Sequence, residues 1–254
     1  MKYKRYNTDL DYSYTLGIYP TIELLKNQAK FVVKIVLHSK FSSEKGSLII
    51  KDYTAKYGIE IEHSDRLIQT LSPKENCYAI GVFKKYHQTL NNQSNHVVLV
   101  NPRNPGNLGT TIRYMLAFDF LDLAVIKPAV DNFNPESIRS SMGALFSIRL
   151  QLFNNIDDYL GSYGTRDFFS LMTNGTNILG ETKFNKPYSL IFGNESSGLP
   201  DSYRDISKPV LIPQSKKVDS LNLAISSSIV LYHLYEQSRK KFPTQGDVAL
   251  SLGE

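Results

Sequence analysis

Hydrophobic and polar positions alternate in short segments along the first third of the chain. Three segments are rich in β-branched and aromatic residues and predict strands, namely residues 31–37 (FVVKIVL), 59–62 and 77–83 (CYAIGVF). Between them the spacing of apolar residues predicts helices over residues 22–28, 47–57 and 65–71, the second of which ends at Gly58, a residue suited to a left-handed helix stop. Strands alternating with helices predict a small α/β domain.

A polar stretch over residues 84–95 (KKYHQTLNNQSN) shows no apolar periodicity and separates this region from the next. Beyond it, four compact apolar segments predict buried strands and three segments with helical spacing predict helices. The strands are 96–100 (HVVLV), 123–126, 188–192 (YSLIF) and 210–212, and the helices are 110–120, 135–142 and 220–241. We therefore expect two α/β domains, residues 1–90 and 96–254, joined by a linker at 91–95.

Composition narrows the class of protein. Of the 254 residues, 41% are hydrophobic and 21% charged, which is ordinary for a folded globular chain. No apolar run approaches the roughly 20 residues that span a bilayer, and residues 1–10 lack the apolar core of a signal peptide. The single cysteine, Cys77, excludes an internal disulfide and a cysteine-rich zinc site. We expect a cytoplasmic protein.

The excess positive charge lies in the first domain. Residues 1–90 contain 14 Lys and Arg against 9 Asp and Glu, whereas residues 91–254 contain 15 of each kind. A basic domain beside a neutral one suggests that the first holds a polyanion for the second. The alternative is a lysine-rich surface that serves solubility, and charge alone does not decide between the two.

Three polar loops follow predicted strands of the second domain, where α/β sheets usually bind ligands. They are residues 101–111 (NPRNPGNLGTT), 193–200 (GNESSGLP) and 213–222 (PQSKKVDSLN). None contains a dinucleotide-binding, phosphate-loop or nucleophile-elbow motif. The five histidines show no ligand-like spacing, so no metal site is expected.

Together the loops resemble the three motifs of the TrmH/SpoU branch of the SPOUT methyltransferases. NPGNLGTTIRYMLAFDF resembles the first motif, LIFGNESSGLP the second and VLIPQSKKVDSLNLAISSSIVLY the third, in the family's order over about residues 96–238. The intervening DNFNPESIRSSMGALFSI also resembles the family, and residues 1–90 more loosely resemble a ribosomal-protein-like substrate-binding domain.

The resemblance implies an α/β catalytic domain with a parallel sheet and a deep trefoil knot, a homodimer whose active sites are completed by the partner chain, and S-adenosylmethionine as cofactor. The catalytic positions it implies are Arg113, Asn107, Glu195, Ser220 and Asn222. The cofactor would contact Gly193, Ile212 and Leu221. RNA contacts are expected from Arg103, Arg139, Lys216 and Lys217.

Each position also has a structural interpretation. Arg113 could be an ordinary exposed helix arginine, and Ser220 could be the N-cap of the last helix. Asn107 could serve a turn, and Glu195, Lys216 and Lys217 could be solvated loop residues. If Arg113 is catalytic, it acts either as the base or, since a guanidinium normally stays protonated, by stabilising charge at the ribose 2′-oxygen or a phosphate.

The function expected from the resemblance is 2′-O-ribose methylation of RNA, with 23S ribosomal RNA as substrate. A tRNA methyltransferase and a non-catalytic RNA-binding assembly factor are the alternatives. The nucleotide, and whether the modification is housekeeping or confers antibiotic resistance, do not follow from these residues.

Overall fold

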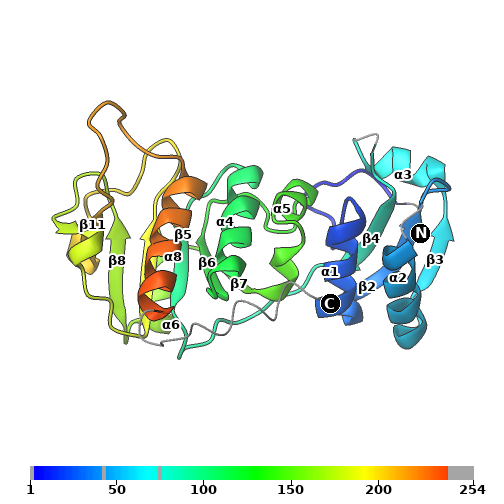
Figure 1. Ribbon diagram of the computed structural model, residues 1–254, viewed down its shortest axis with the longest axis horizontal. Coiled ribbons are helices and arrows are strands. Elements are labelled where there is room, and N and C mark those ends of the chain that lie inside the picture. The colour runs from blue at the N-terminus through cyan, green and yellow to red at the C-terminus, as the bar shows by residue number, and fades with distance from the viewer. Residues whose placement is uncertain (1–2, 42–43, 74–75, 240–254) are drawn as a thin grey trace.

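The computed structural model describes residues 3–41, 44–73 and 76–239, and they form two β-sheets (Figure 1). The smaller sheet has the strand order β1-β4-β2-β3, in which only β2 and β3 pair in parallel. Its strands are β1 (Tyr12–Tyr14), β2 (Val32–Leu37), β3 (Glu60–His63) and β4 (Ala79–Lys84). Its helices are α1 (Ile18–Gln28), α2 (Glu44–Tyr57) and α3 (Asp65–Leu71), with the 3-10 turn η1 (Ala29–Phe31).

Local chemistry explains these elements. Ser64 begins α3 because its side chain accepts a hydrogen bond from the Leu67 amide. Gly58 ends α2 with a φ of +63°, as the sequence predicts, since glycine adopts this left-handed conformation without steric cost. The six predicted strands and helices of this region are confirmed, and the three-residue strand β1 and the 3-10 turn η1 were not predicted.

The larger sheet has seven strands, all parallel, in the order β7-β6-β5-β10-β8-β11-β9, which confirms the α/β class. The strands are β5 (His96–Val100), β6 (Asp122–Ile126), β7 (Arg149–Phe153), β8 (Asp167–Leu171), β9 (Asn177–Ile178), β10 (Tyr188–Phe192) and β11 (Lys208–Leu211). The helices are α4 (Pro105–Ala117), α5 (Pro135–Ser140), α6 (Ile156–Tyr163), α7 (Tyr203–Ile206) and α8 (Leu223–Arg239), with 3-10 turns η2 (Ala144–Ser147) and η3 (Leu179–Glu181).

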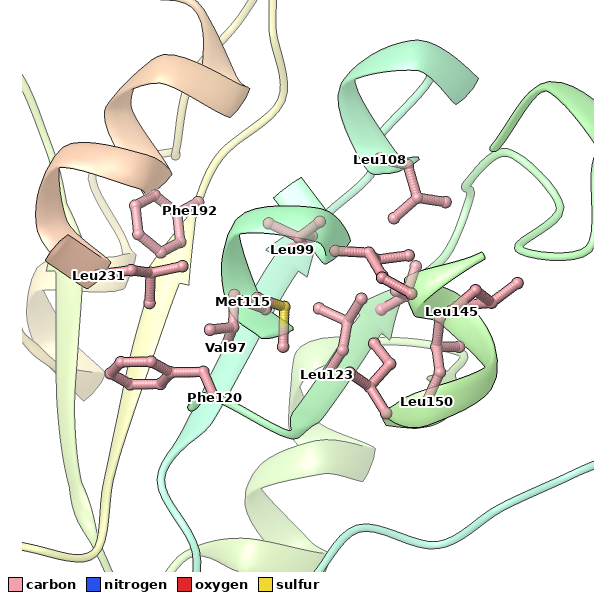
Figure 2. Packing of buried hydrophobic residues seen from close by; sticks show 14 of the residues in the cluster. Val97, Leu99, Leu108, Met115, Phe120, Leu123, Leu145, Leu150, Phe192 and Leu231 are labelled. Carbon is pink, nitrogen blue, oxygen red and sulfur yellow. The ribbon is translucent and has the colours of Figure 1, made fainter. Parts of the chain in front are cut away.

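Both faces of the larger sheet are covered, which is why β5, β6 and β10 are buried at every position. On one face Val97 and Leu99 of β5 pack with Met115 of α4 and Leu231 of α8 (Figure 2). On the other face, alternate residues of the same strand belong to a second cluster that includes Tyr159 of α6. This layered core holds the carboxyl ends of the strands at one edge.

Several predicted helix boundaries are wrong, and helices α4 and α5 end at Ala117 and Ser140 rather than at residues 120 and 142. Helix α4 begins at Pro105 rather than at residue 110, because Asn104 caps it by accepting a hydrogen bond from the Asn107 amide and Pro105 occupies the first turn. Helix α8 begins at Leu223 rather than at residue 220, and its predicted end at residue 241 lies outside the described residues. Asn107 therefore lies on a helix and not in a turn.

The segment between the sheets is anchored rather than loosely tethered. Tyr86 and Leu90 are buried, and the Leu90 amide donates to the side chain of Gln151. The Asn91 amide donates to the buried carboxylate of Asp122, which also accepts two hydrogen bonds from Arg149. Its contacts give this polar stretch a fixed course along the amino-terminal edge of the larger sheet.

The two sheets also share one apolar cluster. Leu24 and Phe83 of the first region pack with Phe133 and Phe146 of the second. At the rim of this contact Asp131 accepts hydrogen bonds from the Tyr6 hydroxyl, at 2.5 Å, and from Lys85 Nζ, at 2.7 Å. Burial and the bond to Asp131 raise the pKa of Tyr6, which keeps the phenol protonated and donating. The joint between the two regions is therefore a packed interface.

Candidate active site

The carboxyl ends of β5, β10 and β11 bring the three polar loops together. Strands β5 and β10 are neighbours, while the chain continues from β5 toward β6 on one side and β8 lies on the other side of β10. A change of direction of this kind leaves a crevice beyond the strand ends, and ligands of open α/β sheets bind there.

Glu195 joins the second loop to the first. One carboxylate oxygen accepts from the Arg103 amide at 3.3 Å, and the other accepts from the Asn104 amide at 3.3 Å and from Asn107 Nδ2 at 3.2 Å. An ionised carboxylate that receives several N–H donors forms stronger hydrogen bonds than a neutral acceptor. Of the partners considered for Glu195, the structure shows a hydrogen bond with Asn107.

Asn222 joins the third loop to the same network. Its Nδ2 donates to Asn107 Oδ1 at 3.1 Å, and its Oδ1 accepts from the amides of Ala224 and Ile225 at 2.9 and 3.4 Å. Asn222 is thus the N-cap of α8, and the alternative interpretation of Ser220 as this cap is wrong. The reason is that α8 begins at Leu223. The backbone amides of its first turn, which have no acceptor within the helix, therefore lie within reach of the Asn222 side chain.

Asn194 is a site residue that was not predicted. Its Nδ2 donates to the Asn101 carbonyl at 2.6 Å, and its Oδ1 accepts from the amide and the hydroxyl of Ser196, at 2.9 and 2.7 Å. Asn101 has a φ of +51°, which turns the chain sharply after β5. An Asn two residues before a Ser is typical of side-chain-closed turns, and this pattern in GNESSG could have indicated the role.

A cavity of about 330 Å³ opens beside this network. Gly193, Ile212 and Leu221, the three residues expected to contact the cofactor, all line it, as do Glu195 and Ser220. Its charged lining residues are Glu195, Asp201 and Asp219, and no lysine or arginine lines it. The volume falls in the range of about 300–1,000 Å³ typical of small-molecule sites, and the acidic lining suits a cationic ligand such as a sulfonium.

The glycines of the second loop shape one wall of the cavity. A β-carbon on Gly193 would lie 2.3 Å from the carbonyl carbon of Gly198, and Gly198 has a φ of +63°. Residues Asn194 and Gly198 also pair through their backbones, with bonds of 3.2 and 3.0 Å. Only glycine at position 193 permits this closure, so the loop presents backbone to the cavity. The residues present therefore fit S-adenosylmethionine.

The predicted basic residues lie outside the cavity. Arg113 is exposed on α4, Arg103 is exposed before it, and Arg139 is exposed on α5. Lys216 and Lys217 are exposed in the loop before α8. The structure thus brings Asn107, Glu195, Asn222, Gly193, Ile212, Leu221 and Ser220 together, whereas the five basic side chains do not line the cavity.

No cluster of three or more His, Cys, Asp or Glu side chains in the described residues is arranged to hold a metal ion. None of the helices in residues 3–41, 44–73 and 76–239 is long and apolar enough to cross a membrane.

The sequence of this chain is similar to those of known proteins. Residues 94–232 match the model of the SpoU rRNA Methylase family. The chain is 31% identical over 150 residues to the 23S rRNA (uridine(2479)-2'-O)-methyltransferase of Streptomyces viridochromogenes, a match that covers 56% of this chain and 52% of that protein. It is 28% identical over 145 residues to the tRNA (cytidine(34)-2'-O)-methyltransferase of Methylovorus glucosotrophus, covering 56% of this chain and 94% of that protein.

The fold has a counterpart among solved structures. The crystal structure of the SpoU methyltransferase AviRb from Streptomyces viridochromogenes superposes with a TM-score of 0.78 at 20% identity, covering 91% of both chains. By sequence, however, this chain spans only about half the length of the 23S rRNA methyltransferase that it matches. The family model covers more than half of the 254 residues. The resemblance drawn from the three loops is confirmed, and the chain belongs to the SpoU rRNA Methylase family.

Proposed function

We propose that the protein transfers a methyl group from S-adenosylmethionine to a ribose 2′-oxygen of RNA, and that the RNA is 23S ribosomal RNA. The observation that carries the proposal is the hydrogen-bonded chain Glu195–Asn107–Asn222 beside the cavity lined by Gly193, Ile212 and Leu221. These residues come from three segments that are far apart in the chain, and every family position assigned to the cofactor lies at the cavity.

The bound cofactor supplies a methyl group already activated by a sulfonium. The task of the protein is to exclude water, orient the 2′-hydroxyl and stabilise the oxygen as its proton leaves. Glu195, Asn107 and Asn222 hold the loops in the required arrangement. We assign Arg113 to the 2′-oxygen or an adjacent phosphate, where its charge stabilises the developing anion.

The position of Arg113 supports a homodimer in which each site is completed by the partner. Arg113 is six residues beyond Asn107 on α4, a rise of about 9 Å and a rotation of about 240° around the helix, so the two side chains point in different directions. Helix α8 carries an exposed apolar stripe of Ile225, Ile229 and Tyr232, at 47%, 38% and 53% exposure. The i, i+4, i+7 spacing of this stripe is typical of a helix that packs against another copy.

The choice of ribosomal RNA rests on the first ninety residues. The match to the tRNA relative takes up 94% of that protein with 145 residues, so that enzyme has no room for a comparable extra domain. AviRb, by contrast, matches over 91% of this chain. With the positive charge of residues 1–90, this favours a domain that holds a large structured RNA, and a cytoplasmic location is part of the same proposal.

The test is transfer of labelled methyl from S-adenosylmethionine to 23S rRNA, 16S rRNA and tRNA, with the site mapped by primer extension. We expect label at one ribose of 23S rRNA, and loss of labelling for Arg113→Ala. Arg113→Lys separates a need for charge from a need for the planar guanidinium. Label in tRNA alone would select the tRNA alternative. Absence of both labelling and cofactor binding would leave the RNA-binding assembly factor.

A further inference from the structure

Tyr19 is a large aromatic residue that the fold leaves in solvent beside the joint between the two regions. It lies in the first turn of α1 and is 69% exposed, although its neighbours Pro20, Ile22 and Leu24 are buried. Single exposed apolar side chains are common on protein surfaces, so it is the position of Tyr19 beside the joint, together with its neighbours, that suggests a contact.

Helix α1 is pressed against the catalytic region one residue away from Tyr19. A β-carbon on Gly143 would lie 3.0 Å from the Pro20 α-carbon and 2.8 Å from the Glu23 β-carbon. Gly143 has a φ of +85° and Met142 a φ of +53°, so two consecutive left-handed residues bring the chain to this contact. Met142 and Tyr19 are therefore each one residue from the same point of closest approach.

Met142 is 39% exposed and its amide donates to the Arg139 carbonyl at 2.9 Å, which places Arg139 one turn earlier on α5. Arg139 is exposed and forms no ion pair with a carboxylate in the described part of the chain. Burial raises the pKa of the Cys77 thiol in the first region, hydrogen bonds with Ser72, Ala79 and Gly17 lower it, and the positive charge of Arg139 lowers it by the smallest amount, in line with a guanidinium that faces the first region.

The carboxylate of Glu23, which lies at this contact, is already engaged. Glu23 accepts hydrogen bonds from Lys26 Nζ at 3.2 Å and from Asn27 Nδ2 at 3.3 Å. The surface around Tyr19 and Met142 thus combines an aromatic face, a thioether and a free cation, with its acidic group paired.

We propose that Tyr19, Met142 and Arg139 bind one unpaired nucleotide of the substrate RNA, with the base on the Tyr19 ring and a phosphate at Arg139. An aromatic ring with an adjacent arginine is the combination that recognises unstacked bases. In Figure 1, α8, α4, α5 and α1 follow one another across both sheets, so an RNA strand that crosses this row passes the joint before reaching α4. This proposal rests on the proposed function, in which RNA is the substrate. It gives the joint between the two regions a role in substrate recognition.

The chain contains no tryptophan, so Tyr19→Trp introduces a single reporter at the joint. We expect its emission to be quenched when a 23S rRNA transcript binds in the absence of cofactor. The matched control is Tyr57→Trp, an exposed ring at the far end of α2, whose emission should stay unchanged. Quenching at both positions or at neither, while filter binding shows that RNA is bound, would overturn the proposal.

Binding affinity gives a second readout. Tyr19→Ala should raise the Kd for the transcript about 5- to 150-fold, and Tyr19→Phe should stay near the wild type because the ring is kept. Arg139→Gln should reduce the slope of log Kd against log salt concentration by about 1, the value expected when one phosphate contact is lost. A wild-type Kd for Tyr19→Ala, or quenching that follows protein concentration instead of RNA, would contradict the proposal. Neither readout depends on methyl transfer, so failure of the proposed enzymatic activity would be recognised separately.

Discussion

Glu195 and Asn107 are 88 residues apart in the chain, yet Asn107 Nδ2 donates to Glu195 Oε1 at 3.2 Å. The same carboxylate receives the amides of Arg103 and Asn104, so it holds the entry of α4 from the opposite side of the crevice. The pair thereby fixes the first and second loops relative to each other.

Replacing Glu195 by alanine should lower kcat/KM for methyl transfer at least tenfold, which corresponds to about 1.4 kcal/mol, because three donors lose their acceptor. Glu195→Gln keeps one oxygen acceptor and should lose less. Steady-state kinetics and thermal unfolding of both variants provide the measurement. Equal activity of Glu195→Ala and the wild type would show that the contact has no role in the reaction.

Asn222 and Ser220 should behave differently, since Asn222 caps α8. Asn222→Ala should reduce the free energy of unfolding by about 1 kcal/mol, and Ser220→Ala by less than about 0.5 kcal/mol. Asn222→Ser should keep the cap but lose the bond to Asn107, so its stability should stay near that of the wild type while its activity falls. Urea unfolding and methyl transfer, measured on all three variants, check this. A larger loss of stability for Ser220→Ala would contradict the observed helix start.

Gly193→Ala should abolish or strongly weaken cofactor binding, because the added carbon would lie 2.3 Å from the Gly198 backbone and must displace the loop. The control is Gly161→Ala, on α6, where an added carbon meets no atom within 4 Å and helix propensity favours alanine by up to about 1 kcal/mol. Isothermal titration with S-adenosylmethionine should give no measurable heat for the first variant and a wild-type Kd for the second. Unchanged affinity in Gly193→Ala would mean that this loop does not shape the cofactor site.

His96 should make stability depend on pH. Its imidazole is buried, with Nε2 donating to the Asn91 carbonyl at 2.9 Å, and burial lowers its pKa to about 4 from the ordinary 6.5. Between these values the unfolded chain binds a proton that the folded chain does not, so the contribution is complete above pH 6.5 and is lost as the pH falls toward 4.

The loss should reach about 3 kcal/mol at pH 4, because the pKa of about 4 in the folded chain lies well below the ordinary 6.5. The measurement is the difference in free energy of unfolding between the wild type and His96→Gln, by urea titration from pH 4 to 7. Because all other titrating groups are common to both proteins, the wild type alone should show this extra slope. Parallel pH profiles would mean that His96 is not held neutral.

The sequence by itself determined most strands and indicated which loops to consider for the site. Apolar segments such as residues 96–100 and 188–192 match β5 and β10, because a strand buried on both faces is a continuous apolar run. The three motifs also pointed to Asn107, Glu195, Gly193, Ile212 and Leu221, all of which the structure brings to one crevice.

Only the tertiary structure decided how these residues meet. Glu195 reaches Asn107 because β10 pairs with β5, and Asn222 reaches Asn107 across 115 residues because α8 packs on α4. It also decided that Asn222, and not Ser220, caps α8, and that Tyr86 and Leu90 bury a stretch that looks like a linker. Contacts of this kind depend on strand order and helix packing, which residue spacing along the chain does not contain.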